Sequence, residues 1–545
     1  MATIQTFPET EIRRNNPMFS RMKSLVETAF YANNVTPVNT IQEAYERAST
    51  LPNTIVLDHT ISHAEELGLN PDTKVILNNG HRVVGRTAAA RRILGQDNGE
   101  ADALYPIVMD ALYAGQTEPF ISGRAIVGLE EDFMVEAHIM MPETYADNLY
   151  SWLLNFQIMN DEYQTRYDQS KSYNETDIYL YFNPDWKHPD YPDGLAIFDP
   201  AQNVAIVLGM QYFGEIKKGT LTLAWATAAR NNYVACHGGL KIFRKEGQDP
   251  YVTSFFGLSG SGKSTLTHAK HEGKYDIQVL HDDAFIIHKD SGNSIALEPA
   301  YFDKTNDYPT DHVEQEFFLT VQNVAVTLNE DHERVLLTED LRNGNGRTVK
   351  SRYSTPNRVD KIDEPINSIF WIMKDETLPP VIKINDPVVA STLGCTLVTK
   401  RSSAENVKDR SGIVVEPYAN PFRVYPLVED YQSFKDLFAK SEVDCYIINT
   451  GSFQGKDITP AVTLGIIEAI VDKTANFEAF PYIDVFEYLN VDGYEIPTDS
   501  EYKDALRSAM EVRLDFINNT VTAKEPDHPL PAEVSEKLQA IVDGI

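Results

Sequence analysis

The sequence predicts a mixed α/β protein with more than one domain, and three observations lead to this prediction. The chain has 545 residues, which is more than one hydrophobic core usually serves. Between residues 100 and 215, helical segments alternate with β-rich ones such as 176–183 and 203–214. At 251–256, an apolar and β-rich run leads into a glycine-rich turn and a helix, as in sheets that alternate strands with helices.

Composition and charge restrict the partners and the compartment. The formal net charge is -32, and such a surface repels nucleic acid and anionic membranes. Three cysteines (Cys236, Cys395 and Cys445) are too few for a disulfide framework. No apolar run approaches the roughly eighteen residues of a membrane span, and the N-terminus lacks the apolar core of a signal peptide. We therefore expect a cytoplasmic monomer or small homo-oligomer that binds small molecules, without nucleic acid or membrane as a partner.

Three polar clusters precede the glycine-rich turn. Residues 82–92 hold four arginines around Gly85-Arg86-Thr87 and follow a strand predicted at 53–58. Residues 212–219 contain Lys217-Lys218, and His237 follows Cys236. Read singly, each cluster favours a structural role, because an exposed lysine or arginine is ordinarily solvated and a lone histidine is ordinarily structural.

The glycine-rich turn itself fits the phosphate-binding pattern G-x-x-x-x-G-K-[ST]. Its glycines allow successive backbone N–H groups to surround a polyphosphate, and the following helix directs its positive end there. Lys263 would contact the β- and γ-phosphates, and the Ser264 hydroxyl would face Mg²⁺. The predicted nucleotide-binding residues are Gly257, Leu258, Ser259, Gly260, Ser261, Gly262, Lys263, Ser264 and Thr265.

A second apolar run at 277–280 ends in Asp282-Asp283, where carboxylates can hold a metal beside the phosphates. Buried strands are predicted at 367–373 and 444–451, and the C-terminal part of the chain is predicted to be helical. The segment 398–412 is charged and rich in helix breakers, which would suit a mobile loop over a site.

Taken together, these motifs resemble the ATP-dependent phosphoenolpyruvate carboxykinases. The resemblance is carried by Tyr212-x-Gly-Glu-x-Lys217-Lys218-Gly, by His237 nineteen residues after Lys218, by the phosphate-binding loop in its Phe-Phe-Gly-Leu-Ser-Gly setting, and by Asp282-Asp283. It covers roughly residues 55 to 490. It implies a two-lobed fold with the active site in the cleft, made of a substrate-binding domain at 1–238 and a domain at 239–545 that binds nucleotide and metal.

The resemblance also implies a role for each matched residue. Lys218, His237 and Asp283 would coordinate Mn²⁺, with Asp282 holding metal-bound water and Ser264 binding the Mg²⁺ of ATP. Arg86 and Tyr212 would bind the dicarboxylate substrate, because a guanidinium suits a carboxylate. Lys304 would lie near the γ-phosphate. Arg352, in a match to Arg-x-Ser-x-Pro, would stabilise the phosphoryl group during transfer. The implied reaction converts oxaloacetate and ATP to phosphoenolpyruvate, ADP and CO₂.

The chain also departs from the family pattern. Ala88-Ala89-Ala90 follows the Arg86 motif, Ala284 follows the aspartate pair, and Arg410 is displaced relative to Glu416-Pro417. Two alternative functions therefore stay open. In the first, the chain is a diverged kinase of the same fold that phosphorylates another small acid or a protein hydroxyl. In the second, it is a nucleotide-binding regulatory protein without turnover.

Overall fold

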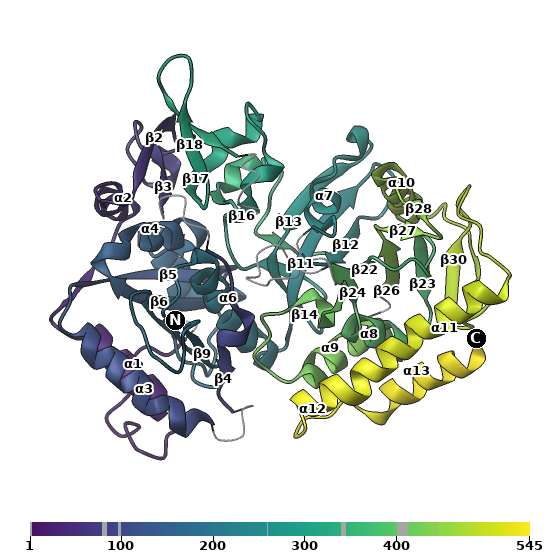
Figure 1. The fold of residues 1–545 in the computed structure, drawn as a ribbon, viewed down its shortest axis with the longest axis horizontal. Helices are drawn as coiled ribbons and strands as arrows, with labels where there is room; N and C mark the ends of the chain where they lie inside the picture. The colour runs from purple at the N-terminus through teal and green to yellow at the C-terminus, as the bar shows by residue number, and fades with distance from the viewer. Residues whose placement is uncertain are drawn as a thin grey trace. The chain divides into compact units, whose positions relative to one another are not determined.

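The computed structural model describes residues 3–78, 84–95, 100–258, 260–338, 345–400, 413–441 and 443–545 (Figure 1). Arg82, Ser259, Arg410 and the part of the predicted mobile loop after residue 400 lie outside the described residues. The described chain forms two compact units that alternate along the sequence. The first unit holds residues 3–227 and 297–356, and the second holds 228–296 and the described residues from 357 to 545. The predicted domain boundary at 238 stays a prediction; by compactness, the segment 297–356 belongs to the first unit.

A mixed eight-stranded sheet forms the centre of the first unit, in the order β1-β5-β6-β8-β10-β9-β4, with β7 paired to β5. Every residue of β6, β8, β9 and β10 is buried, as expected for strands covered on both faces. The strands are β1 (Val35–Pro37), β4 (Arg91–Ile93), β5 (Phe120–Glu130), β6 (Phe133–Pro142), β7 (Gln157–Ile158), β8 (Ile178–Asn183), β9 (Leu195–Asp199) and β10 (Val204–Leu208).

Helices cover this sheet. Apolar residues of α1 and α3 join β8, β9 and β10 in one hydrophobic cluster. Helix α6 approaches the sheet closely at Gly219, where an added Cβ would lie 3.5 Å from side-chain atoms of Leu180 and Phe198. The helices of the first unit are α1 (Arg21–Phe30), α2 (Ile41–Ser49), α3 (Glu100–Gly115), α4 (Ala146–Asn155), α5 (Asp161–Gln169) and α6 (Phe213–Arg230), whose last residues cross into the second unit.

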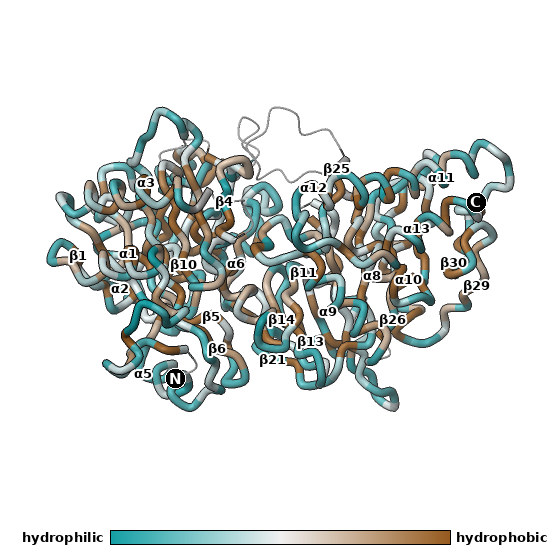
Figure 2. The backbone as a smooth tube through the Cα atoms, turned by 90° about the horizontal axis from the view of Figure 1, so that it is seen from below, coloured by the Kyte–Doolittle hydropathy of each residue, from teal (hydrophilic) through white to brown (hydrophobic). Residues whose placement is uncertain are grey.

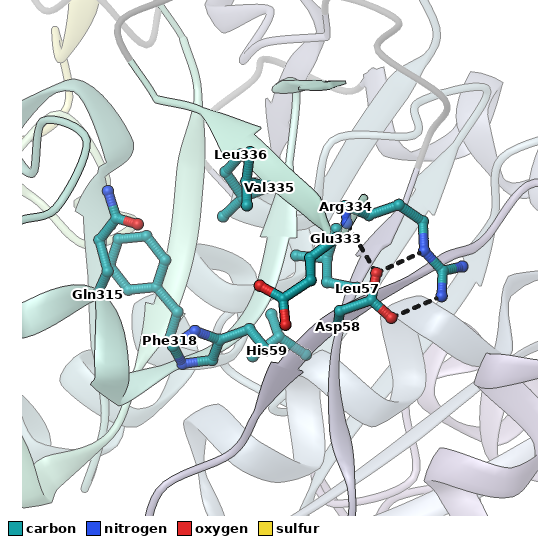
Figure 3. A pocket seen from close by; sticks show the side chains of 10 residues that line it. Leu57, Asp58, His59, Gln315, Phe318, Glu333, Arg334, Val335 and Leu336 are labelled. Carbon is teal, nitrogen blue, oxygen red and sulfur yellow. Dashed lines mark hydrogen bonds and ion pairs between the residues drawn. The ribbon is translucent and has the colours of Figure 1, made fainter. Parts of the chain in front are cut away.

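A five-stranded sheet, β16-β20-β17-β3-β2, explains why residues 297–356 belong to the first unit. Its strands are β2 (Ile55–Thr60), β3 (Lys74–Asn78), β16 (Tyr301–Lys304), β17 (Phe318–Gln322) and β20 (Arg347–Lys350). Strand β17 runs parallel to β3, so two segments far apart in the sequence share one ladder. The hairpin of β18 (Ala325–Leu328) and β19 (Arg334–Leu337) lies beside β2 (Figure 1), and the Arg334 guanidinium donates to both carboxylate oxygens of Asp58 at 3.0 Å (Figure 3).

The second unit is built on an eleven-stranded sheet, β21-β15-β14-β11-β12-β22-β26-β23-β30-β29, with β13 also paired to β11. Strands β12, β22 and β26 run parallel at its centre and are almost wholly buried. The strands are β11 (Tyr233–Arg244), β12 (Tyr251–Phe256), β13 (Asp276–His281), β14 (Ala284–His288), β15 (Ser294–Ala296), β21 (Lys361–Ile362), β22 (Ser368–Met373), β23 (Val381–Ile384), β26 (Asp444–Asn449), β29 (Phe477–Ala479) and β30 (Phe486–Leu489).

Aromatic side chains fill one face of this sheet, where the Tyr418 and Phe434 rings stack at 4.5 Å and Trp371 meets both edge-on. Helices α11 and α13 pack against each other (Figure 1). The remaining elements are α7 (Lys263–His268), α8 (Pro387–Cys395), α9 (Leu427–Lys440), α10 (Pro460–Val471), α11 (Ser500–Asp515), α12 (Thr522–Lys524), α13 (Ala532–Gly544) and the short strands β24 (Val398–Lys400), β25 (Ile413–Val415), β27 (Ser452–Phe453) and β28 (Lys456–Asp457).

The predicted mixed α/β class is confirmed. The strands predicted at 53–58, 251–256, 367–373 and 444–451 correspond to β2, β12, β22 and β26. Figure 2 shows apolar strands inside each unit and hydrophilic loops around them. In the part of the chain that the structure describes, no helix combines the length and the apolar character needed to cross a membrane.

A buried ion pair anchors α6, and its removal gives a first prediction. Lys217 Nζ lies 2.7 Å from Glu298 Oε1, both side chains are fully buried, and Asn155 Nδ2 donates to Glu298 Oε2 at 2.6 Å. Lys217→Met leaves the buried carboxylate without this lysine, which typically costs about 3–5 kcal/mol. We expect a clearly lower melting temperature by near-UV circular dichroism.

The partly exposed pair Lys435–Glu533 supplies the control, because such pairs contribute at most about 1 kcal/mol. Lys435→Met should therefore melt close to the wild type. The double variant Lys217→Met with Glu298→Gln should recover part of the lost stability, since the Glu298 carboxylate is then no longer buried without its lysine. Equal melting of Lys217→Met and Lys435→Met would contradict the prediction.

Candidate active site

The phosphate-binding loop of the second unit connects β12 to α7, as predicted. Gly260 and Gly262 have φ values of +86° and +100°, a backbone region that residues with a side chain rarely adopt. At Gly257, an added Cβ would lie 2.3 Å from Ser261 Oγ. The two glycines of the pattern and Gly260 between them are therefore required by the shape of the loop, which supports a phosphate-binding conformation.

Contacts on both sides hold this loop in place. Thr450 Oγ1, directly after β26, donates to the Ser261 carbonyl at 2.8 Å. Helix α7 begins at Lys263, and Thr267 Oγ1 donates back to the Lys263 carbonyl at 2.9 Å. The predicted phosphate-binding lysine thus stands at the first position of the helix, where backbone N–H groups are available to an anion.

His237, Lys263 and Asp283 meet beside the loop. His237 Nε2 lies 3.0 Å from Asp283 Oδ1, and Lys263 Nζ lies 3.4 Å from the same oxygen. Strand pairing brings them together, because His237 of β11 is the register partner of Ala284 of β14 and the Gly238 N–H donates to the Asp283 carbonyl at 3.1 Å. Two of the predicted metal ligands and the predicted phosphate lysine therefore form one cluster.

The environment of His237 suits a metal ligand. Its Nδ1 donates to the Ala419 carbonyl, and this contact leaves the lone pair of a neutral ring on Nε2. Nε2 and the Asp283 carboxylate are then two acceptors at hydrogen-bond distance, which need either a proton or a cation between them. A histidine that binds a carbonyl through one nitrogen and presents the other is the usual arrangement around a bound metal.

Asp282, the other predicted carboxylate, is buried and faces His268. Burial alone would raise its pKa, but the hydrogen bond from His268 and the charges of His268 and Lys263 hold the pKa of Asp282 below its ordinary value. The carboxylate therefore stays ionised at neutral pH. His281 also organises the turn, because its Nδ1 accepts from the backbone N–H of Asp283 at 3.0 Å and of Ala284 at 3.1 Å.

In the first unit, Arg86 lies beside Glu215 of α6. Arg86 is 8% exposed. Glu215 Oε1 accepts from the Thr87 backbone N–H at 3.3 Å. Burial raises the pKa of Glu215, and Arg86 and Arg91 oppose this rise. The Gly85-Arg86-Thr87 motif and the α6 motif therefore meet at one carboxylate, which lies on the same helix as the half-buried Lys218.

Lys304 and Arg347 form a second cationic group of the first unit. They are register partners on β16 and β20, and Arg347 Nε lies 3.3 Å from the Tyr212 hydroxyl oxygen, to which it donates. Burial and the neighbouring charge of Arg347 lower the pKa of Lys304. Arg347 was not among the predicted residues, although it lies only five positions before Arg352.

Arg352 lies on the wall of a different cavity. That cavity, of about 890 Å³, is lined by Arg352 and Tyr353 together with Gln157, Asn160 and Tyr163. A second cavity, of about 670 Å³, is lined by Gly85, Thr87, Gln211, Tyr212 and the segment 184–188, among others. The structure thus brings the predicted substrate residue Tyr212 and the sequence neighbours of Arg86 to the rim of one cavity and places Arg352 at another.

A buried group of two carboxylates and one histidine lies elsewhere in the first unit, and no sequence motif predicted it. Glu136, His138 and Asp177 are the one group of three carboxylate, imidazole or thiol ligands within reach of a single ion in the described part of the chain. His138 Nε2 lies 2.9 Å from Asp177 Oδ2, and Arg124 Nε donates to Glu136 Oε1 at 2.6 Å. Arg124 and His138 thus each bind one carboxylate of this group, so contacts within the chain hold the three side chains together.

Comparison with known proteins identifies the family. The strand, phosphate-binding loop and helix first define a P-loop nucleotide-binding protein. The sequence model of the ATP-type phosphoenolpyruvate carboxykinase family matches residues 95–498, more than half of the chain. The chain therefore belongs to this family, which confirms the resemblance read from its motifs.

Curated relatives are similar at low identity. The chain is 27% identical over 326 residues to phosphoenolpyruvate carboxykinase (ATP) of Aeropyrum pernix, a match that covers 56% of this chain and 65% of the relative. It is 24% identical over 345 residues to the glycosomal enzyme of Trypanosoma brucei brucei, covering 58% and 69% of the two chains. For the Dictyostelium discoideum enzyme the identity is 24% over 353 residues, covering 61% and 59%. The matches thus span about two thirds or less of each relative.

The left-handed backbone at Gly262 gives the second prediction. Gly262→Ala has space for its methyl group, since the nearest atom is 3.9 Å away, but it would place a non-glycine residue at φ +100°. Such strain costs about 1–2 kcal/mol and would shift the loop, so MgATP affinity should fall by roughly tenfold. Isothermal titration calorimetry measures the change.

Gly465→Ala is the matched control. Gly465 lies within α10, and an added Cβ there meets no atom within 4 Å. Alanine favours a helix over glycine by about 1 kcal/mol, so this variant should bind MgATP normally and melt at the same or a higher temperature. Normal MgATP binding by Gly262→Ala would show that the loop tolerates a side chain there.

Proposed function

We propose that the protein is an ATP-dependent phosphoenolpyruvate carboxykinase, which converts oxaloacetate and ATP to phosphoenolpyruvate, ADP and CO₂. The observation that carries the proposal is the His237–Asp283–Lys263 cluster, in which Asp283 contacts both the other proposed metal ligand and the proposed phosphate-binding lysine. A simple nucleotide-binding loop has no need of this histidine. The similar proteins, which are named phosphoenolpyruvate carboxykinase (ATP), support the same reaction.

The cofactors of the proposed reaction are ATP, Mg²⁺ and Mn²⁺. Ser264 and Asp282 would serve the Mg²⁺ of ATP and its water, and His237, Asp283 and Lys218 would hold Mn²⁺. When bound, the divalent cations supply Lewis-acid polarisation of oxygen and neutralise charge on the phosphates. Lysine ligates only as a neutral amine, so this role requires a lowered pKa for Lys218.

The chain's own residues would act on the substrate in two stages. Arg86 holds a carboxylate of oxaloacetate, and Tyr212 lies against the substrate. The bond between the β-carboxylate and C3 breaks, CO₂ leaves, and the electron pair stays on the substrate as an enolate. The enolate oxygen then attacks the γ-phosphorus of ATP, and the bond to ADP breaks.

Cations of the chain would stabilise the transferred phosphoryl group. Lys263 binds the phosphates from the loop, and Lys304 contributes a second ammonium. Arg347 is buried beside Lys304 and the predicted substrate residue Tyr212. We therefore assign to Arg347 the charge-stabilising role that the Arg-x-Ser-x-Pro match had suggested for Arg352. The proposed partners are small molecules alone, and the proposed compartment is the cytoplasm.

An assay with and without oxaloacetate tests the proposal, as the third prediction. With MgATP and Mn²⁺, we expect oxaloacetate-dependent formation of phosphoenolpyruvate and ADP. Phosphorylation of another small acid or of a protein hydroxyl, without phosphoenolpyruvate, would favour a diverged kinase. Nucleotide binding without any turnover would favour a regulatory protein. Lys218→Ala should abolish the reaction and spare MgATP binding, and retained activity would contradict the role of Lys218.

A comparison of the two arginines is the fourth prediction. Arg347→Gln should lower kcat by about 10²–10³-fold, the usual cost of removing one group that stabilises the transition state. Arg352→Gln is the matched variant, five residues further on, and should lower kcat much less. Steady-state kinetics with oxaloacetate and MgATP measure both. The reverse order of effects would return the role to Arg352.

A further inference from the structure

Helix α7, which carries Lys263 and Ser264, is short and ends abruptly. It spans six residues, and its C-cap Ala269 already has non-helical backbone angles. The chain then turns through His271 and Glu272, which have φ values of +47° and +54°. The last carbonyls of a helix lack partners within the helix, so this end needs hydrogen-bond donors from elsewhere.

Lys241 of β11 supplies these donors. Its side chain is fully buried, and Nζ donates to the Leu266 carbonyl at 2.6 Å and to the Ala269 carbonyl at 3.2 Å. The third contact of Nζ is His271 Nε2, at 3.1 Å. An ammonium has three N–H donors, and here each has an acceptor. A cation at the C-terminal end of a helix also interacts favourably with the helix dipole.

His271 connects Lys241 to α10. Its Nδ1 lies 2.9 Å from Glu468 Oε1, so a ring that accepts from Lys241 through Nε2 donates to Glu468 through Nδ1. Burial and the charge of Lys241 lower the pKa of His271, which keeps the ring neutral, as this arrangement requires. We name Lys241, His271 and Glu468 the α7 clamp.

Strand β11 also contacts α7 at Thr267, one residue before the helix ends. At Gly239, an added Cβ would lie 1.9 Å from Thr267 Oγ1 and 3.1 Å from Thr267 Cβ, so only glycine permits this approach. Gly239 and Lys241 are two residues apart and lie on the same face of the strand. The helix therefore rests on β11 at one point and is held by Lys241 at its end.

We infer that Lys241 is a positioning residue for nucleotide binding, which acts by fixing α7 through the clamp; this inference rests on the proposed function. A helix of six residues is only about 9 Å long, so a shift at its end also moves its first residues. Those first residues are Lys263 and Ser264. Loss of the Lys241 ammonium should therefore weaken the binding of MgATP, although Lys241 lies at the opposite end of the helix from the loop.

The inference predicts a pH dependence. Burial lowers the pKa of Lys241 to about 7, and the charge of Glu468 opposes this shift. The other charged groups around the clamp are Lys274, which also binds Glu468, and Asp472, which binds both Lys245 and Lys274. The ammonium is present below its pKa and is lost above it. MgATP affinity should therefore fall as the pH rises through about 7.

The test, as the fifth prediction, compares Lys241→Met with Lys245→Met in the full chain. Lys245 lies directly after the same strand, binds Asp472 at 2.8 Å and is not part of the clamp. By titration calorimetry, Lys241→Met should raise the Kd of MgATP by about tenfold or more and flatten its change between pH 6 and 8.5. Lys245→Met should keep the affinity and the pH profile of the wild type.

Wild-type affinity and pH profile in folded Lys241→Met would overturn the inference. If that variant does not fold, Glu468→Ala replaces it, because the Glu468 side chain is 27% exposed and its loss releases His271 without emptying the core. Unchanged MgATP affinity in Glu468→Ala would then overturn the inference. Binding needs no turnover, so a wild type that binds MgATP but forms no phosphoenolpyruvate would refute the proposed function alone.

Discussion

The pairing of β11 with β12 on one side and with β14 on the other holds the second unit's site together. Gly238 and Gly239 are register partners of Phe256 and Phe255, at the end of the strand that enters the phosphate-binding loop. On the other edge, His237 pairs with Ala284, directly after Asp283. One strand therefore sets the distance from His237, the proposed metal ligand, to the loop and to the carboxylates. A slip of one residue would turn His237 to the opposite face of the sheet.

Charge is distributed unevenly in this protein. The chain as a whole is strongly acidic, yet Arg86, Lys263, Lys304 and Arg347 are buried or largely buried beside the candidate sites of their units. Arg86, Lys263 and Arg347 have neighbours that make burial tolerable: Glu215, Asp283 and the Tyr212 hydroxyl, in that order. Anionic substrates would thus meet preorganised cations that need little reorganisation when charge develops.

The local parts of the fold and site could be predicted from the sequence, and the non-local parts could not. The loop at 257–264 was predictable because a strand, glycines and a helix follow one another along the chain. Membership of 297–356 in the first unit depends on the parallel pairing of β17 with β3, which no local pattern reveals. The contact of Arg347 with Tyr212 is a product of tertiary structure, so the local Arg-x-Ser-x-Pro match could indicate Arg352 but not Arg347. His268 and His281 flank predicted motifs, so proximity to Asp282 could have indicated them.

The alternation of the two units along the chain has a consequence for biosynthesis. The five-stranded sheet of the first unit is complete only when β17 has paired with β3 and β20 has paired with β17. Both β17 and β20 follow the entire phosphate-binding segment in the sequence. During translation, β2 and β3 must therefore wait while the loop, α7 and β13 leave the ribosome. Domains that are contiguous in sequence can fold one after another from the N-terminus. Here the order of synthesis and the order of completion differ. Strand β3 exposes an unpaired edge until its partner β17 (Phe318–Gln322) has been synthesised.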